Sequence, residues 1–428
     1  MAELTGDSPH EKTVLDNGLT VLTSSMPHTR SVSVGIFIGA GSRYEADKIA
    51  GASHFLEHLL FKGTKQWPTA RELSEAVEGV GGIINASTDR EMTVFWCKVA
   101  RPNFPTAFSV LVDMIRNPIL DPKEVEKERE VVLEELRMIN DYPSNRVDLL
   151  IDESLWPDQP MGRDVGGSLD SVKEITPKQI ADYMRHQYTP GNAVVAVAGD
   201  IYHNEVVESM GEALKDWVPA EPITWYPVQD GQETPRVRVE RRKTDQAHVC
   251  IGLPSLPLTH PDRYVLSLMN VMLGEGMSSR LFLELREKQS LCYDVHSSIS
   301  LFRDCGSLVV YCGVEPKKTE RAIGAALEQL SSLQESAPQS ELDKARELSK
   351  GKMLLRMEDS RSVAMWMGAQ QTLSGNVRTV DEVVESLEAV TTEDVKRVAG
   401  ELIREEKLNL AIVGPYRSEQ RFLNLLKF

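Results

Sequence analysis

The chain has 428 residues, which is too long for one ordinary hydrophobic core and suits two or three domains. Its formal net charge of −16 argues against a nucleic-acid partner, because phosphates attract a basic surface. No apolar run approaches the roughly 20 residues that cross a bilayer, so we expect no membrane-spanning segment. The five cysteines form no CxxC pair and the N-terminus does not resemble a secretory signal, which together favour a cytoplasmic location.

The first half of the chain alternates short strands with helices. Apolar alternation predicts strands within residues 12–25, 31–41, 92–100 and 192–200. Helices are expected at about 49–62, 69–79, 103–116, 122–140 and 177–187. Asp16-Asn17-Gly18 provides a hairpin turn inside the first strand segment. Thr69 and Glu72, three residues apart, predict a capping box at the start of the second helix.

Residues 216–235 are rich in proline and lack a helical period, so we interpret them as an interdomain linker. After it, a similar order of elements recurs, with strands expected at 247–256, 297–302, 306–314 and 408–415. We therefore predict an α+β fold of two related halves, a catalytic half over 1–215 and a half without metal over 236–428. Each half should be a mainly antiparallel sheet with helices packed on one face, and the two should enclose a chamber.

The stretch His54-Phe-Leu-Glu57-His58 carries the clearest chemical signal. On a helix, His54 and His58 lie one turn apart on the same face, so both imidazoles can reach one point. Neutral imidazole is a preferred zinc ligand. Glu57 lies about 100° round the helix from His58, where it could take a proton from a water on the metal. An amphipathic helix that happens to carry polar residues is the alternative.

A third ligand should come from residues 121–140, which are dense with carboxylates. At about 100° per residue, one arc of this helix is apolar: Val125, Val131, Val132, Leu136 and Ile139. Glu128 and Glu135 fall inside that arc, whereas Lys127, Glu130 and Glu134 fall outside it. Buried carboxylates are costly unless something cationic compensates them, and a metal ion would do so. This selects Glu135 with Glu128 in support, and pairing with a buried arginine is the competing explanation.

These residues resemble the metal site of the insulinase and pitrilysin family of zinc metallopeptidases, the inverzincins, whose signature is H-x-x-E-H. The resemblance covers nearly the whole chain. In length the chain is similar to the short members of the family, which include bacterial peptidases and the mitochondrial processing peptidase. The resemblance implies that Zn²⁺ is held by His54, His58 and Glu135. It also implies that Glu57 acts as the general base and that Glu128 is the helper glutamate of the site.

Two further stretches gain a role from the resemblance. Residues 79–96 predict a glycine loop and a β-hairpin, and the family uses this edge strand to bind an extended peptide around Asn85 and Ala86. An ordinary covered edge strand is the alternative. Arg286 and Tyr293 match a pair that the family uses to contact the substrate and the developing oxyanion. From its residue type alone, Arg286 is equally consistent with a surface charge.

Departures from the family pattern narrow the function. The second half has no H-x-x-E-H, so we expect it to bind no metal. The long glycine-rich loop of the processing peptidase's non-catalytic partner is absent, which favours a chain that is catalytic itself. Asn145 and Leu149 replace the acidic residues with which that peptidase reads a substrate arginine, so the resemblance does not imply cleavage near an arginine.

The sequence thus predicts a zinc endopeptidase that hydrolyses short, unfolded peptides. The alternative of a different class is a non-catalytic structural or assembly subunit of the same family. Nucleotide binding at residues 35–43 is disfavoured, because Tyr44 occupies the position of the last glycine of GxGxxG. Short family members act as dimers, so the resemblance implies a homodimer or a heterodimer with an inactive paralogue.

Overall fold

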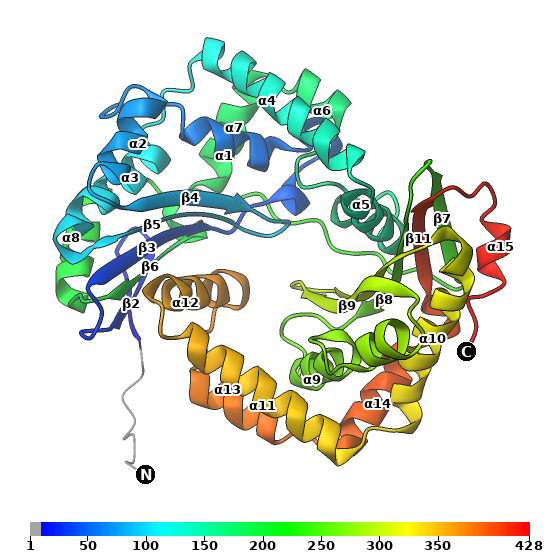
Figure 1. Ribbon diagram of the computed structural model, residues 1–428. Coiled ribbons are helices and arrows are strands. Elements are labelled where there is room, and N and C mark those ends of the chain that lie inside the picture. The colour runs from blue at the N-terminus through cyan, green and yellow to red at the C-terminus, as the bar shows by residue number, and fades with distance from the viewer. Residues whose placement is uncertain (1–9) are drawn as a thin grey trace. The chain divides into compact units, whose positions relative to one another are not determined.

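The computed structural model describes residues 10–428, and two compact units are present, each built around one sheet (Figure 1). The described part of the first unit consists of residues 10–136, Asp164–Tyr226 and Leu354–Thr379. The second unit consists of Arg137–Arg163, Pro227–Met353 and Val380–Phe428. Among the described residues, no helix is both long and apolar enough to cross a membrane.

The units are interleaved in the sequence. Residues 137–163 come before the expected linker but belong to the second unit, and 354–379 come after it but belong to the first. The structure therefore differs from the two contiguous halves expected over 1–215 and 236–428. The expected linker, 216–235, contains no helix or strand, and the division between the units falls inside it.

The first unit contains a six-stranded sheet with the order β1-β2-β6-β3-β5-β4. Its strands are β1 (Glu11–Val14), β2 (Thr20–Ser25), β3 (Ser31–Ile38), β4 (Ile83–Thr88), β5 (Thr93–Ala100) and β6 (Ala193–Gly199). β1 and β2 form the predicted hairpin, in which Gly18 adopts a φ of +89° at the turn. β2 and β6 run parallel, and every other neighbouring pair is antiparallel.

The second unit contains a five-stranded sheet with the order β7-β11-β8-β10-β9. Its strands are β7 (Arg236–Arg241), β8 (Ala247–Ser255), β9 (Cys292–Leu301), β10 (Gly306–Val314) and β11 (Asn409–Gly414). In both sheets the last strand in chain order is parallel to one neighbour and antiparallel to the other. β6 lies between β2 (parallel) and β3 (antiparallel), and β11 lies between β7 (parallel) and β8 (antiparallel). The first strand of the following hairpin, β4 in one sheet and β9 in the other, forms an edge of its sheet. The predicted relationship between two α+β halves is confirmed.

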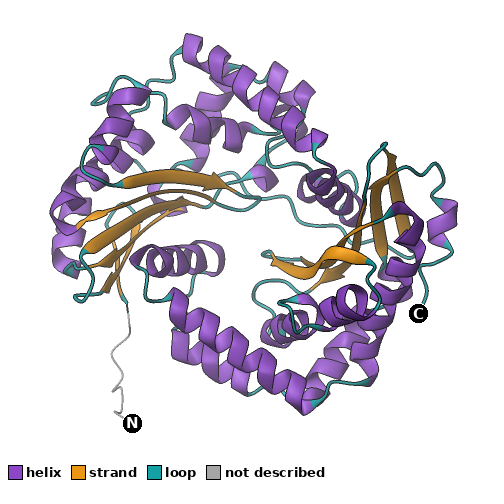
Figure 2. Cartoon of the chain, in the orientation of Figure 1, coloured by secondary structure: helices purple, strands orange, loops and turns teal. Residues whose placement is uncertain are grey.

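Helices border each sheet (Figure 2). The first unit contains α1 (Ala52–Leu60), α2 (Ala70–Glu78), α3 (Phe104–Arg116), most of α4 (Pro122–Asp141), α6 (Leu169–Glu174), α7 (Pro177–Gln187), α8 (His203–Leu214) and α12 (Ser360–Ser374). The second contains α5 (Pro143–Leu155), α9 (Arg263–Gly274), the π-helix Phe282–Lys288, α10 (Thr319–Glu335), most of α11 (Gln339–Arg356), α13 (Val380–Glu388), α14 (Thr392–Leu402) and α15 (Gln420–Leu423). The capping box at Thr69 and Glu72 is present as predicted.

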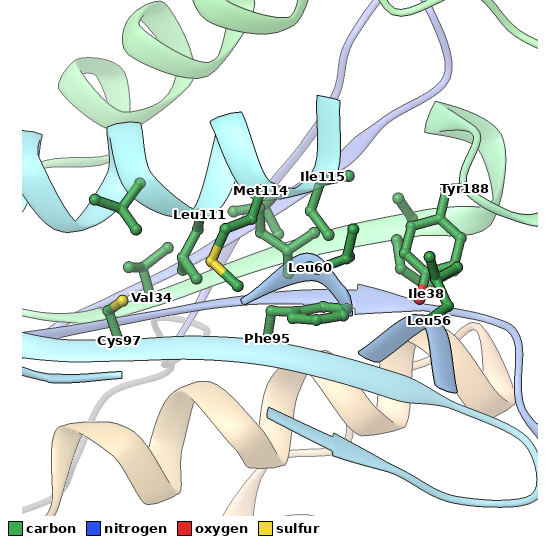
Figure 3. Close-up of a cluster of buried hydrophobic side chains, with 14 of the residues drawn as sticks. Val34, Ile38, Leu56, Leu60, Phe95, Cys97, Leu111, Met114, Ile115 and Tyr188 are labelled. Atoms are coloured by element: carbon green, nitrogen blue, oxygen red, sulfur yellow. The ribbon is translucent and has the colours of Figure 1, made fainter. Parts of the chain in front are cut away.

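Both faces of the first sheet are covered. Because side chains alternate along a strand, Val34 and Ile36 of β3 join one core, with α1, α3 and α4, whereas Phe37 joins another with α12. Figure 3 shows part of the larger core, in which Leu60 of α1 and Met114 of α3 pack above the sheet. The prediction of helices on one face therefore omits α12, which comes from after the linker.

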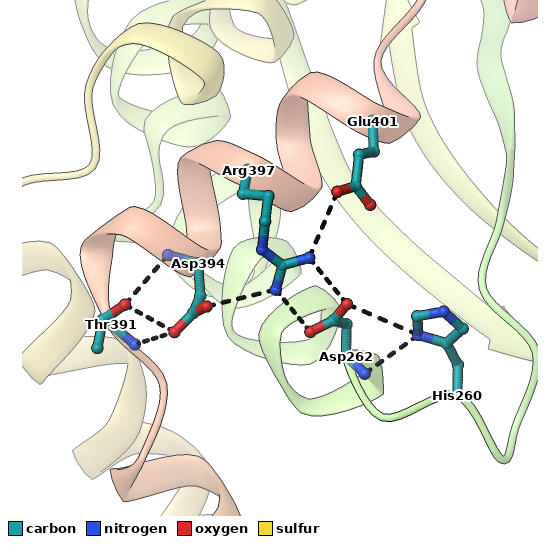
Figure 4. A network of polar contacts seen from close by, with 6 residues as sticks. All are labelled: His260, Asp262, Thr391, Asp394, Arg397 and Glu401. Atoms are coloured by element: carbon teal, nitrogen blue, oxygen red, sulfur yellow. Dashed lines mark hydrogen bonds and ion pairs between the residues drawn. The ribbon is translucent and has the colours of Figure 1, made fainter.

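In the second unit, α5 packs on β8 and β11, and Ile151 and Leu155 enter a core with Cys250. Elsewhere in the second unit, a polar network connects α14 to Asp262, which directly precedes α9 (Figure 4). Arg397 donates to both carboxylate oxygens of Asp262, at 2.7 and 3.0 Å. These hydrogen bonds lower the pKa of Asp262, so the carboxylate remains ionised.

One detail of α4 differs from the prediction. Val125, Val132 and Leu136 are buried as expected, but half of the surface of Val131 is exposed and Leu133 is buried instead. The buried arc is thus rotated away from Val131, because the core contacts the side of the helix that also buries the stem of Arg129.

Candidate metal centre

Helix α1 begins where the backbone makes a close approach that only glycine permits. Gly51 has a φ of +95°, and a Cβ there would lie 2.3 Å from the carbonyl oxygen of Gly166. The buried Glu45 carboxylate then accepts hydrogen bonds from the backbone N–H groups of Gly51 and Ser53, at 2.6 Å each. These bonds satisfy N–H groups that have no partner within the helix, and so they fix where α1 starts.

Farther along α1, the imidazoles of His54 and His58 both point toward Glu135 of α4. The Nε2 atoms of His54 and His58 are 3.2 Å apart. The Glu135 Oε2 atom lies 3.8 Å from the first and 3.5 Å from the second. Among the described residues, this is the only group of three or more His, Cys, Asp or Glu whose ligand atoms converge in this way.

The spacing of these atoms fits a tetrahedral metal ion. Ligand atoms about 2.1 Å from a tetrahedral zinc ion lie roughly 3.4 Å from one another. The three measured separations, 3.2, 3.5 and 3.8 Å, bracket that value. Two imidazoles and one carboxylate are also a ligand set that catalytic zinc sites use, with one position left for water or substrate.

Glu128 orients the His58 ring. The His58 Nδ1 atom lies 2.9 Å from Glu128 Oε1, and Lys62 donates to the other oxygen. Burial would raise the pKa of Glu128, but the hydrogen bonds from His58 and Lys62 outweigh it and lower the pKa, so Glu128 is ionised. In its neutral form the His58 ring then carries its proton on Nδ1 and presents the Nε2 lone pair to the cluster. The cation paired with Glu128 is thus the partly buried Lys62 and not the buried arginine of the competing explanation.

His54 is held in its neutral form. Burial, together with the neighbouring His58, lowers its pKa to about 4. Its Nδ1 atom is buried and has no hydrogen-bond partner among the described residues. Since only the neutral ring binds a metal, a low pKa keeps His54 ready to act as a ligand at neutral pH.

Glu57 stands beside the cluster without joining it. Its side chain is half-buried and accepts a hydrogen bond from the Thr88 hydroxyl at the end of β4. Burial raises the pKa of Glu57, while Thr88 and His58 oppose that rise. A carboxylate whose pKa lies above its ordinary value is a better proton acceptor for water at neutral pH.

The first unit also contains the predicted peptide-binding strand. β4 is the edge of the first sheet, and Asn85 and Ala86 lie on it, with Asn85 exposed. The Asn85 side chain accepts a hydrogen bond from the Ala86 N–H at 2.8 Å. Since one side of an edge strand has unpaired N–H and C=O groups, β4 can form backbone hydrogen bonds with an extended segment.

Arg286 and Tyr293 lie in the second unit, where they contact each other. The Arg286 guanidinium donates to the Tyr293 carbonyl oxygen at 2.9 Å. It also stacks between the rings of Phe282 and Tyr293, with centroids 4.7 and 4.5 Å away. The Tyr293 residue is 76% exposed, so its phenol is available to a ligand.

Three polar residues around α1 were not selected from the sequence. Lys62 lies four residues after His58 and could have been found from helical phase. Thr88 could not have been found from the sequence, because its position beside Glu57 depends on how β4 packs against α1. Glu45 lies in an irregular segment and its sequence gives no signal of its capping role.

Two family models match the chain. One, described as "Insulinase (Peptidase family M16)", matches residues 20–168, and the other, described as "Peptidase M16 inactive domain", matches residues 174–349. The first match contains the whole candidate metal centre, and the second contains Arg286 and Tyr293.

Relatives align over almost the full length. A Streptomyces coelicolor protein named an uncharacterized zinc protease is 35% identical over 96% of this chain and 90% of its own length. The β subunit of the mitochondrial processing peptidase of Dictyostelium discoideum is 27% identical, over 95% of this chain and 89% of its own. The crystal structure of a protease from Helicobacter pylori is 26% identical, with a TM-score of 0.90, and it covers 95% of this chain and 99% of that chain.

Proposed function

The chain belongs to the insulinase family of peptidases, family M16, and from this premise we propose that it is a zinc-dependent endopeptidase that hydrolyses short, unfolded peptides. The observation that carries the proposal is the convergence of the ligand atoms of His54, His58 and Glu135 beside a carboxylate, Glu57, that is not part of the cluster. A ligand set alone could serve a structural metal, whereas a free base beside it suits hydrolysis.

Each residue of the centre has a separate task in this proposal. His54, His58 and Glu135 hold Zn²⁺, which when bound supplies a Lewis acid for a peptide carbonyl and acidifies water. Glu57 takes the proton from the attacking water and returns it to the leaving amine. Glu128 fixes the His58 ring through its Nδ1 proton.

Substrate binding is assigned to two elements. An extended peptide pairs with the backbone of β4 at Asn85 and Ala86, which gives affinity with little side-chain selectivity. Arg286 and Tyr293 donate hydrogen bonds to the substrate backbone and to the developing oxyanion. Their mutual packing supports this role, because a guanidinium stacked between two rings is already ordered before it binds.

A chelation experiment with the variant Glu57→Gln tests the function. The purified protein should cleave an unstructured peptide, lose that activity with a chelator and regain it with Zn²⁺, with products identified by mass spectrometry. Glu57→Gln should bind a full equivalent of zinc but hydrolyse at least about 100-fold more slowly, since it lacks the base. Undiminished hydrolysis after metal removal, or near-normal activity of Glu57→Gln, contradicts the proposal.

A second candidate is a non-catalytic structural or assembly subunit of the same family. The family match over residues 174–349 to a model described as an inactive domain favours it for the second half only. The same chelation experiment separates the two, because a structural subunit cleaves nothing with or without zinc. The free cysteines support a cytoplasmic location, and we expect a homodimer or a heterodimer with an inactive paralogue.

A further inference from the structure

Thr88 makes the contact that fixes the direction of Glu57. Its hydroxyl lies in hydrogen-bond contact with Glu57 Oε2. Among the described residues, no other hydrogen bond or ion pair to the Glu57 carboxylate is present. A glutamate side chain has three rotatable torsions, so without this contact the helix alone leaves its carboxylate free to turn.

The chemistry of the contact sets its polarity. An ionised carboxylate can only accept, so the Thr88 hydroxyl must be the donor. The neighbouring Thr93 hydroxyl donates to the Ala40 carbonyl oxygen at 2.9 Å and lies 3.5 Å from the Thr88 oxygen. The Thr88 hydrogen is therefore left for Glu57, and charge-assisted bonds of this kind are the stronger ones.

Thr88 is also a rigid donor. It is the last residue of β4, where its half-buried side chain lies on the same face as Ala86, toward α1. A β-branched side chain on a strand has few χ1 choices, so its hydroxyl cannot easily follow a moving partner. The donor is thus anchored to the sheet, whereas Glu57 is carried by the helix.

We infer that Thr88 is a positioning residue, which holds the Glu57 carboxylate beside the His54, His58 and Glu135 cluster and links the peptide-binding strand to the base. The inference rests on the proposed function, since it assigns Thr88 to the same reaction. β4 carries the proposed peptide-pairing residues at its centre and the Glu57 donor at its end. A substrate held on β4 and the hydroxyl that orients the base therefore lie on one rigid element.

Three variants test the inference. Thr88→Val keeps the shape of the side chain and removes the donor, and Thr88→Ser keeps the donor and removes the methyl group. Thr23→Val is the matched control, since Thr23 is a buried threonine of β2 in the same sheet, whose hydroxyl bonds the His203 ring at 2.8 Å. It removes a buried hydroxyl far from the metal centre.

For Thr88→Val we expect kcat to fall about 10- to 100-fold, with KM within about twofold and zinc content unchanged. Thr88→Ser should stay within about threefold of the wild-type kcat, because the donor is retained. Thr23→Val should keep the wild-type kcat. Wild-type kinetics for Thr88→Val, or a Thr88→Ser protein as slow as Thr88→Val, would overturn the inference.

Crystal structures give a readout that needs no activity. Glu57 should occupy one rotamer against residue 88 in the wild type and in Thr88→Ser, and should turn away or divide between rotamers in Thr88→Val. An unchanged Glu57 rotamer in Thr88→Val rejects the positioning role, even if the protein proves to hydrolyse no peptide. Conversely, an altered rotamer in a protein without peptidase activity supports the contact and rejects only the proposed function.

Discussion

The two imidazoles of α1 are the same residue type one turn apart, yet their pKa values move in opposite directions. Burial lowers the pKa of His54 to about 4, and the nearby His58 adds to that effect. Burial acts on His58 as well, but the hydrogen bond to Glu128 and the surrounding carboxylates outweigh it and raise the pKa. Glu128 thus decides where the His58 proton resides, although it is not among the converging ligand atoms.

This role predicts that Glu128→Gln weakens zinc binding without abolishing it. The amide oxygen can still accept from His58 Nδ1, but the negative charge that makes the ring a stronger ligand is gone and Lys62 loses its partner. The zinc dissociation constant, measured by competition with a chromophoric chelator, should rise about 10- to 100-fold. Glu130→Gln, at an exposed site of the same helix, is the control and should bind like the wild type. Equal affinities for the two variants would contradict the role of Glu128.

The sequence contains enough information to select the converging residues but not those that steady them. The i, i+4 spacing of His54 and His58 and the helical phase of Glu135 are local properties, so periodicity makes these residues candidates, and the resemblance to the family completes the selection. Thr88 depends on strand pairing and on the packing of β4 against α1, which no local pattern encodes. Periodicity therefore predicts part of the candidate ligand set, but it does not predict how the Glu57 carboxylate is oriented.

At the scale of elements, the sequence predicted where several helices lie, but it predicted less well which face of a helix is buried. The capping box of α2 and the apolar period of α7 give their positions closely, because both signals are local. The rotation of α4 is not local, since Val131 and Leu133 are both apolar and only the core contact decides which is buried. For α12, no local pattern identifies the sheet on which it packs, because its buried residues are few and small apart from Met367.

The contact between α12 and the first sheet depends on a glycine. A Cβ at Gly368 would lie 2.1 Å from Cε2 of the buried Phe37 ring, closer than real atoms come. Gly368→Ala should therefore lower the midpoint of chemical denaturation, because overpacking costs about 1–3 kcal/mol and exceeds the roughly 1 kcal/mol that alanine gains in a helix.

Gly324→Ala in α10 is the matched control for this prediction. A Cβ at Gly324 meets no atom within 4 Å, so the substitution should be neutral or slightly stabilising. If Gly368→Ala unfolds at the same denaturant concentration as the wild type, α12 does not pack on Phe37 as closely as the contact distance indicates.

At the scale of the molecule, the recurrence of a similar order of elements could be inferred from the sequence, but neither β7 (Arg236–Arg241) nor the exchange of helices was expected. Each half of the chain gives one helix to the unit built mainly from the other half: α5 belongs to the second unit and α12 to the first. Neither helix could be assigned to a sheet from the sequence. The linker at 216–235 therefore joins two units that are not independent segments of the chain.

This exchange predicts that neither half folds properly alone. A fragment of residues 1–226 lacks α12, so Phe37, Val94 and Val194 on the uncovered face of the first sheet become exposed. Each fully buried side chain of this kind contributes about 1.5–3 kcal/mol through its burial, which the fragment loses in part. The fragment should bind a hydrophobic dye and aggregate, as should 227–428, which lacks α5.

Co-expression of the two fragments should restore both units, because each fragment then receives its missing helix from the other. A tag on the first fragment should recover the second in equal amount, with dye binding as low as that of the intact chain. The intact chain cut between Tyr226 and Pro227 at an inserted protease site is the control, and its pieces should stay associated. If 1–226 alone is monomeric and binds no dye, α12 is dispensable for covering the first sheet, and the interleaving of the two units has no structural consequence.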